Sequence, residues 1–510
     1  MIEPAGLGAS ESRNGVLGVH RRSVVKVSHF SKTTKCFSFD PVADLPQLDN
    51  PPLRTDPHYL RPVHTSPLKR WLVGLTLFIV LLFSAYLWVK PLLSIGGGYA
   101  AKHACSCHFL QGRALEEISE HDLNFSVLGR YSLERFGDTV RASLPGLMER
   151  RAVHLPGRGC VLINDPKLSL PPADGKPATA REPQAFRLAP NDTGQVTTFT
   201  PDLSAALDFG MQAVPGGGAR GLVILKDGQL AGERYAPGCD HNSRLLGWSM
   251  TKTLTGLAVG AYLYRNSATH TAPADAAKQN TGLFPTYWTD ARSDIALADL
   301  LRMNSGLAWN EGYGSITDAT VMLHERPDFA DFALRSQLTA TPGREWNYSS
   351  GTTNILMEYL RGEIGDNAGL YAFVDSLFRP VAPSLLIEPD QSGRPVGSSY
   401  GWATTRDWAR LGQLMLQEGI WQGDTLVPAE WIEFMREPAA GSEGIYGAQL
   451  WLPGPDTPSI PADAFMMRGF QDQRVFILPS HGLVIARLGH SDDKVTDFDG
   501  LIQRILVAYE

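Results

Sequence analysis

The sequence predicts a protein of the α/β (α+β) class, in which an antiparallel sheet is built from both ends of residues 201–510 and flanked by helices. Strand-like stretches open this region, at 221–235, and close it, at 465–488, whereas residues 295–417 have mostly helical spacing of apolar side chains. This order predicts one sheet and an inserted, mostly helical lobe. The apolar run Trp71–Val89 predicts one transmembrane helix ahead of this domain.

The length and charge of the chain limit its class. A chain of 510 residues can hold one large or two ordinary domains. The formal net charge is −7, which argues against nucleic acid as a partner. Residues 1–70 are basic, with 10 Lys and Arg against 6 Asp and Glu, and the remainder is acidic. Residues 1–69 are also rich in proline, so we predict a largely disordered tail there.

Residues 70–90 form the predicted membrane-spanning segment. The run Trp71–Val89 has 19 residues without a charge, preceded by Lys69 and Arg70 and followed by Lys90. That length suits a single-pass helix, and the positive-inside tendency keeps the basic tail in the cytoplasm. We therefore expect an inner (cytoplasmic) membrane of bacterial type, with the following domain in the periplasm. The alternative is a signal peptide cleaved among the small residues 96–101, although a lead of about seventy residues is long for one.

Residues 91–200 are predicted to form a lead-in region that packs on the main domain as a stalk. Short helices are expected at Gly112–Glu120 and Leu144–Arg151, a strand at Gly159–Ile163, and a loop at Pro166–Pro190. No stretch in this region suggests chemistry.

The cysteines after the apolar run would face an oxidising compartment, where disulfides persist. They are Cys105, Cys107, Cys160 and Cys239, and four cysteines allow three pairings. Cys105 and Cys107 are separated by one residue, which is shorter than the usual spacing of zinc ligands. We therefore expect no metal, and nothing in the sequence suggests a cofactor.

The main domain, residues 201–510, has predicted elements at both of its ends. It opens with a helix at Leu203–Met211 and a hairpin, in which Gly221–Leu225 and Gln229–Tyr235 flank a turn. At its C-terminal end the expected elements are the strands Phe465–Phe470, Arg474–Leu478 and Leu483–Leu488 and the amphipathic helix Leu501–Ala508.

The candidate nucleophile lies in the stretch Leu245–Tyr264. Gly247 precedes Ser249, and the apolar residues that follow recur at helical spacing, which places Ser249 at a helix N-terminus. Lys252 is three residues further on, so its amine shares a helix face with the Ser249 hydroxyl. A serine hydroxyl needs such an adjacent base because it is a weak nucleophile on its own. The pattern occurs often by chance and is weak evidence alone.

A second candidate stretch, residues 341–351, is a loop ahead of a helix. It contains Tyr348, and a phenol close to ammonium groups has its ionised form favoured, which would suit a proton shuttle. By itself, Tyr348 fits an ordinary half-buried aromatic residue better than a catalytic one.

These stretches together resemble the penicillin-recognising serine hydrolases, a family of class C β-lactamases, DD-peptidases, related esterases and 6-aminohexanoate-oligomer hydrolases. Ser249-Met-Thr-Lys252 matches its first motif, and Tyr348-Ser-Ser350 matches its Tyr-x-Asn/Ser motif about one hundred residues later. Residues 297–307 and 401–412 are similar to two further landmarks of the family, so the resemblance covers roughly residues 200–510.

The resemblance implies roles for these residues. Ser249 would form the acyl-enzyme, and Tyr348 would pass a proton to the leaving group. Lys252 would be the general base or keep Tyr348 ionised, and the sequence leaves both open. Ser350, where many relatives have Asn, would hydrogen-bond Lys252 or the substrate.

The family's third motif is Lys-Thr/Ser-Gly or His-x-Gly, and here the nearest match is Met467-Arg468-Gly469-Phe470. Gly469 permits close backbone approach, and the Phe470 N–H would join the Ser249 N–H as an oxyanion hole. Arg468 replaces the expected Lys or His. It is either a carboxylate clamp, since guanidinium binds carboxylates in a forked geometry, or a surface residue of the strand.

The region 305–313 is most similar to the 6-aminohexanoate-hydrolase branch. Trp309 and Tyr313 are candidates for an acyl pocket and Glu311 for binding a substrate amine; the alternative is a packed lid with a solvated acid. The resemblance implies a membrane-anchored serine hydrolase acting on a small amide or ester substrate without metal or cofactor. A penicillin-binding DD-peptidase, a β-lactamase, an acyltransferase and a catalytically silent binding protein remain alternatives.

Overall fold

The computed structural model describes residues 66–173, 200–266, 272–279, 281–455, 457–492 and 494–510. The chain divides into two units, Met1–Arg70 and Trp71–Glu510, and the second holds the elements that form the site. The predicted tail lies outside the described residues up to residue 65, as does most of the predicted loop Pro166–Pro190.

The main sheet joins the two ends of residues 201–510, as predicted. Its strand order is β12-β13-β14-β5-β6, with antiparallel pairing throughout. The central contact is between β14 and β5, where Ile485 lies opposite Ile224. The strands are β5 (Gly218–Lys226), β6 (Gln229–Tyr235), β12 (Phe465–Gly469), β13 (Gln473–Leu478) and β14 (Leu483–His490).

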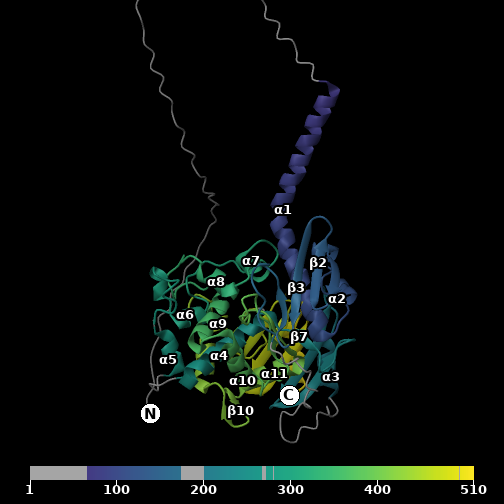
Figure 1. Ribbon diagram of the computed structural model, residues 1–510. Coiled ribbons are helices and arrows are strands. Elements are labelled where there is room, and N and C mark those ends of the chain that lie inside the picture. The colour runs from purple at the N-terminus through teal and green to yellow at the C-terminus, as the bar shows by residue number, and fades with distance from the viewer. Residues whose placement is uncertain (1–65, 174–199, 267–271, 280, 456, 493) are drawn as a thin grey trace, which may run out of the picture. The chain divides into compact units, whose positions relative to one another are not determined.

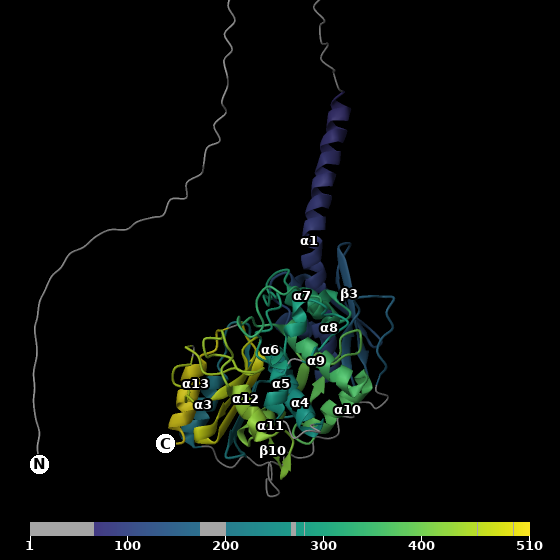
Figure 2. The same cartoon turned by 90° about the vertical axis from the view of Figure 1, so that its left-hand side faces the viewer.

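Helices cover both faces of this sheet. On one face, α3 (Pro201–Gly210) and α13 (Phe498–Val507) bury a cluster of Leu, Ile and Phe side chains against the strands (Figure 2). On the other face, α11 (Thr405–Leu416) and α4 (Thr251–Asn266) join the larger core. The helical lobe and its connections contain α5 (Pro273–Lys278), α6 (Leu297–Leu301), α7 (Asp318–Glu325), α8 (Phe329–Leu334), α9 (Ser350–Ile364), α10 (Asn367–Phe378) and α12 (Ala429–Arg436).

Short strands complete the domain beside the main sheet. One small sheet has the order β7-β9-β8, and another pairs β10 with β11. These strands are β7 (Arg244–Leu246), β8 (Leu386–Ile387), β9 (Gly401–Thr404), β10 (Ile420–Trp421) and β11 (Asp424–Thr425). Because β7 immediately precedes Ser249, its pairing with β9 holds the start of the candidate site.

The predicted apolar run is the first part of one long helix, α1 (Pro67–Gln111). Side chains of the run are mostly exposed, whereas those between Ile95 and Cys107 are mostly buried. By length and composition α1 can cross a membrane. The helix continues from one part into the other, with Pro91 between them.

The lead-in region packs against the buried part of α1 as a second sheet, in the order β1-β2-β3-β4 (Figure 1). Its elements are α2 (Leu115–His121), β1 (Ser132–Phe136), β2 (Thr139–Leu144), β3 (Met148–Leu155) and β4 (Gly159–Leu162). The helix predicted at Leu144–Arg151 is wrong. Pro145 and Gly146, the latter with φ of 70°, form a tight turn there, and β3 follows.

A disulfide joins α1 to the lead-in sheet. Cys105 on the helix is bonded to Cys160 on β4, with 6.0 Å between their Cα atoms. Among the described cysteines, Cys107 and Cys239 are free thiols. Each of the three pairings that the sequence left open contains two disulfides, and the structure has only the bond between Cys105 and Cys160 among the described cysteines.

Candidate active site

Ser249 lies in a short turn of 3₁₀ helix, Trp248–Met250, directly before α4. The residue before it, Trp248, has φ of 49°, which is in the left-handed region that a bulky side chain rarely adopts. Such backbone strain persists only where the surroundings hold the residue in place, and it is often found at functional sites. Ser249 is therefore presented on a constrained turn at the start of α4.

The Lys252 amine contacts the candidate nucleophile. Its Nζ donates to Ser249 Oγ at 3.0 Å, to Ser350 Oγ at 2.8 Å and to the carbonyl of Ser398 at 3.0 Å. Burial lowers the pKa of Lys252 to about 8, although the charge of Glu311 opposes this shift. An amine with that pKa is partly neutral near pH 7, and a neutral amine can accept the proton of the serine.

Tyr348 lies beside this pair within a group of aromatic rings. Lys252 Nζ is 5.0 Å from the centre of its ring, which also contacts Trp346, Tyr446 and Trp451. Burial raises the pKa of Tyr348 and the charge of Glu311 raises it further, against a smaller lowering by the hydrogen bond with Ser249. Burial therefore acts against the predicted ionised form of Tyr348 more strongly than the nearby cations favour it.

Glu311 is the centre of a hydrogen-bond network. Its carboxylate accepts from the backbone N–H of Ser350 at 2.8 Å and the Ser350 hydroxyl at 2.5 Å. It also accepts from Trp309 Nε1 at 2.6 Å and from the hydroxyl of Tyr313 at 2.5 Å. Both oxygens are thus engaged by protein donors, and only 14% of the side chain is exposed. This arrangement suits a residue that positions Ser350 better than the predicted binding of a substrate amine.

The third predicted stretch lies next to the nucleophile turn. A Cβ atom on Gly469 would come within 2.1 Å of the Gly247 carbonyl, so only glycine allows β12 this close to the turn. The Phe470 ring contacts Trp248 and stacks on Tyr313, with centroids 5.8 and 5.2 Å apart. The oxyanion hole formed by the N–H groups of Ser249 and Phe470 stays a prediction.

Arg468 and Trp309 are both held by aromatic or backbone packing. The guanidinium of Arg468 lies 4.5 Å from the centre of the Trp451 ring, and its charge opposes the raised pKa of Tyr348. Arg468 is thus near the site, as a substrate clamp would require. The Trp309 ring covers Gly351 on α9, where a Cβ atom would come within 2.5 Å of it. Trp309 is therefore part of the packed wall.

The ring of Trp248 packs against side chains of α1. It stacks on Tyr99 and His103, with centroids 6.0 and 6.4 Å apart, and its Nε1 donates to Gln471 Oε1 at 3.1 Å. Tyr99 and His103 are four residues apart and so lie on one face of the helix. Sequence reasoning missed this contact, because helical spacing predicts that face and cannot predict which residue packs against it.

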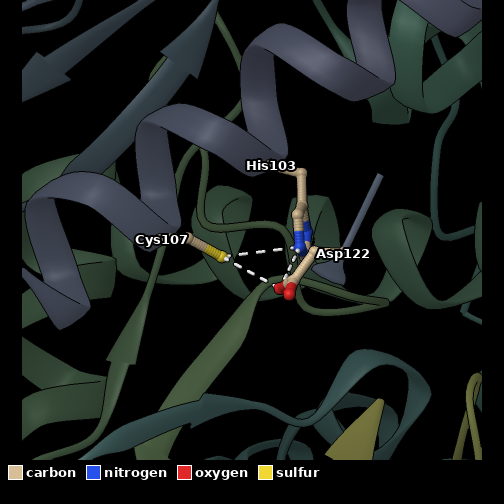
Figure 3. A group of neighbouring side chains, drawn as sticks. All are labelled: His103, Cys107 and Asp122. Carbon is tan, nitrogen blue, oxygen red and sulfur yellow. Dashed lines mark hydrogen bonds and ion pairs between the residues drawn. The ribbon is translucent and has the colours of Figure 1, made fainter. Parts of the chain in front are cut away.

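Figure 3 shows His103 with Cys107 and Asp122, a buried group whose N, S and O atoms are within reach of one cation. His103 Nε2 is 3.2 Å from Asp122 Oδ2 and 3.4 Å from Cys107 Sγ. However, Asp122 also accepts from Arg113 at 2.8 and 3.0 Å and from Arg220 at 3.0 Å. Two guanidinium groups oppose a further cation, so the group fits an ion-pair cluster that joins α1 to β5 better than a metal site.

The family comparison matches the part of the chain that holds Ser249, Lys252 and Tyr348. A model of the family described as Beta-lactamase matches residues 204–510. The chain belongs to the beta-lactamase family. This beta-lactamase-family protein is 24% identical over 316 residues to 6-aminohexanoate-dimer hydrolase of Paenarthrobacter ureafaciens, a match that covers 56% of this chain and 76% of the relative.

Solved structures to which the chain is similar include a protein from Bacillus anthracis provisionally identified as a 6-aminohexanoate-dimer hydrolase. It has 20% identity and a TM-score of 0.48, covering 62% of this chain and 83% of that one. A penicillin-binding protein homologue from Caulobacter crescentus has 15% identity and a TM-score of 0.46, covering 61% and 98%. Helix α1 and strands β1–β4 precede the residues that the beta-lactamase family model matches.

Proposed function

We propose that this beta-lactamase-family protein is a serine hydrolase that cleaves a small amide or ester through an acyl-enzyme on Ser249. The observation that carries the proposal is the contact of 3.0 Å between Lys252 Nζ and Ser249 Oγ. Burial lowers the pKa of that amine to about 8. At pH 7 a base with such a pKa is neutral in about a tenth of molecules, enough to act as a general base.

Lys252 takes the hydroxyl proton as Ser249 Oγ attacks the substrate carbonyl carbon. The carbonyl oxygen becomes an oxyanion, for which the N–H groups of Ser249 and Phe470 are the proposed donors. As the tetrahedral intermediate collapses, the bond to the amine or alkoxide breaks. Tyr348 is the proposed donor of a proton to that leaving group, and it regains a proton from Lys252. Water then attacks the ester carbonyl by the same steps, releasing the acid and restoring Ser249.

The surroundings of the nucleophile support a small, partly apolar substrate. Tyr348 and Trp451 are the proposed aromatic surface on one side, and Tyr313 with Phe470 on another. Arg468 beside Trp451 is the proposed clamp for a carboxylate, if the substrate has one. The name of the relative from Paenarthrobacter ureafaciens makes a linear 6-aminohexanoate dimer the first amide to test.

The same proposal includes anchoring in a bilayer. The run Trp71–Val89 in α1 is long and apolar enough to cross a membrane, and its side chains are mostly exposed. Lys69 and Arg70 precede the run, so the tail is proposed to be cytoplasmic and the hydrolase domain periplasmic.

Peptide mapping after acylation tests the mechanism. The full chain in detergent is incubated separately with a fluorophosphonate, penicillin, an activated ester and the linear 6-aminohexanoate dimer. We expect a fluorophosphonate adduct on the peptide that contains Ser249, and turnover of the ester or dimer that Ser249→Ala abolishes.

The Ser350 peptide is the internal control, because its hydroxyl contacts the same amine. An adduct on Ser350, or full turnover by Ser249→Ala, would contradict the mechanism. A long-lived penicilloyl adduct on Ser249 would favour a penicillin-binding peptidase. No adduct with any probe would favour a silent scaffold.

A further inference from the structure

The turn between β2 and β3, residues Leu144–Met148, is apolar and lies beside the apolar run of α1 (Figure 1). Its sequence is Leu-Pro-Gly-Leu-Met, and the Leu147 side chain is 50% exposed. The hydroxyl of Tyr86 on α1 donates to the Leu147 carbonyl at 3.0 Å. An exposed apolar turn is therefore attached directly to the segment proposed to cross the membrane.

The contact fixes the level of the turn along α1. Tyr86 precedes Lys90, the first charge after the run, by four residues, which is about 6 Å along a helix axis. Tyrosine side chains prefer the boundary between acyl chains and headgroups. Trp88 on the same stretch is 83% exposed, as expected for a residue that faces lipid at this boundary. The proposed membrane span therefore puts Leu147 at the level of the outer interface of the bilayer.

Rigid contacts below the turn keep it at this level. Arg150 on β3 donates to Ser94 Oγ at 2.7 Å and to the Ser94 carbonyl at 3.1 Å. The Tyr131 hydroxyl donates to the carbonyl of Leu93. The disulfide between Cys105 and Cys160 adds a covalent link further along the helix. The sheet β1–β4 cannot move away from α1 without breaking these contacts.

We propose that the turn Leu144–Met148 is a membrane-contacting surface that inserts Pro145 and Leu147 among the lipid headgroups beside α1. This inference rests on the proposed anchoring of α1 and is independent of the proposed chemistry. The partner is the interface of a phospholipid bilayer. Burying one leucine there is a small gain, and its effect is to add a second contact point that fixes how the hydrolase domain is oriented on the membrane.

The opposite end of the same sheet supplies a matched control. Phe136, at the turn between β1 and β2, is 55% exposed, close to the value for Leu147. The six residues of β2 separate the two turns, a distance of about 20 Å along a strand. Phe136 is therefore expected in water, whereas Leu147 is expected in lipid.

Site-specific fluorescence in the full chain tests the inference. Cys36, Cys107 and Cys239 are replaced by alanine, the disulfide is kept, and the protein is placed in phospholipid nanodiscs. An environment-sensitive dye is attached to Leu147→Cys, to Phe136→Cys, and to Ile79→Cys within the apolar run. Quenching by iodide and by spin-labelled lipid is then measured. Pro145→Cys repeats the test at the same turn if labelling at residue 147 disturbs the protein.

We expect lipid quenching at positions 79 and 147, and iodide quenching at 147 roughly threefold weaker than at 136, because the lipid interface excludes the anion. If position 79 is shielded from iodide while 147 is as accessible as 136, the inference is overturned and the anchoring stands. If all positions are open to iodide, the anchoring itself fails, and the inference fails with it.

Discussion

Two buried lysines mark two different regions of the molecule. Lys252, in the candidate active site, has two serine hydroxyls and a carbonyl as partners, and the Glu311 carboxylate is 4.0 Å away. Lys102, on the buried part of α1, forms a close ion pair with Glu388 and also donates to Ser106. Burial lowers the pKa of both amines, but the ion pair and hydrogen bond with Glu388 oppose the lowering at Lys102, whereas only the more distant charge of Glu311 opposes it at Lys252.

The two lysines have different proposed roles: Lys252 takes part in the reaction, and Lys102 stabilises the fold. Lys252 lies within the residues that the beta-lactamase family model matches, and Lys102 lies before them. Nevertheless the region of Lys102 reaches the turn that holds the candidate nucleophile, because Tyr99 and His103 of the same helix stack on Trp248. The part of the chain outside the family match therefore supports the turn that presents Ser249.

The largest effect is expected from Lys252→Met. Removing the general base should lower kcat/KM for an activated ester on the order of 10³-fold. The melting temperature should stay the same or rise, since the change removes a buried charge without leaving an ionised partner in direct contact. Ester kinetics and calorimetry on the same preparation measure both. A variant that keeps more than a tenth of the activity would remove Lys252 from the proposed role.

Lys102→Met should show the opposite pattern. Glu388 would remain buried, still accepting from Cys160 N at 2.6 Å and Trp402 Nε1 at 2.8 Å but without its cation. We expect a loss of about 3 kcal/mol in the free energy of unfolding, because the charge left behind is uncompensated. Denaturant unfolding measures this loss. At denaturant concentrations too low to unfold it, the variant should reach half-maximal activity at the same pH as the unmodified protein. A shifted value would mean that the two lysines are coupled.

The smallest expected effect concerns the pH dependence. Activity should rise with pH through about 8, because Lys252, whose pKa is lowered to about 8 by burial, must lose its proton to act as a base. Glu311 opposes that lowering, so Glu311→Gln should move the midpoint of the kcat/KM profile to lower pH. The plateau should fall roughly tenfold as Ser350 loses its position. A midpoint that moves upward or stays in place would contradict the electrostatic role of Glu311.

Local sequence patterns were sufficient to predict the main sheet and the helix that follows Ser249. Alternating and helical spacing predicted the strands of the main sheet and the helix after Ser249, because burying one face of each element dictates its period. The same approach failed at Leu144–Arg151. The prediction of a helix there gave more weight to the surrounding apolar residues than to Pro145 and Gly146, which are both helix-breaking residues. The pairing of Cys105 with Cys160 was also beyond it, since pairing depends on which elements pack together.

By itself, the sequence identified the candidate reactive side chains: Ser249, Lys252 and Tyr348 follow one another in the order and at the spacing of the family's motifs. Only the tertiary structure decided how their pKa values are shifted. Burial lowers the pKa of Lys252 and raises that of Tyr348, because a low-dielectric environment disfavours the charged form of either group. It also decided that Glu311 bonds Ser350 and that α1 supports Trp248. Desolvation and long-range contacts depend on the whole fold, and no local spacing encodes them.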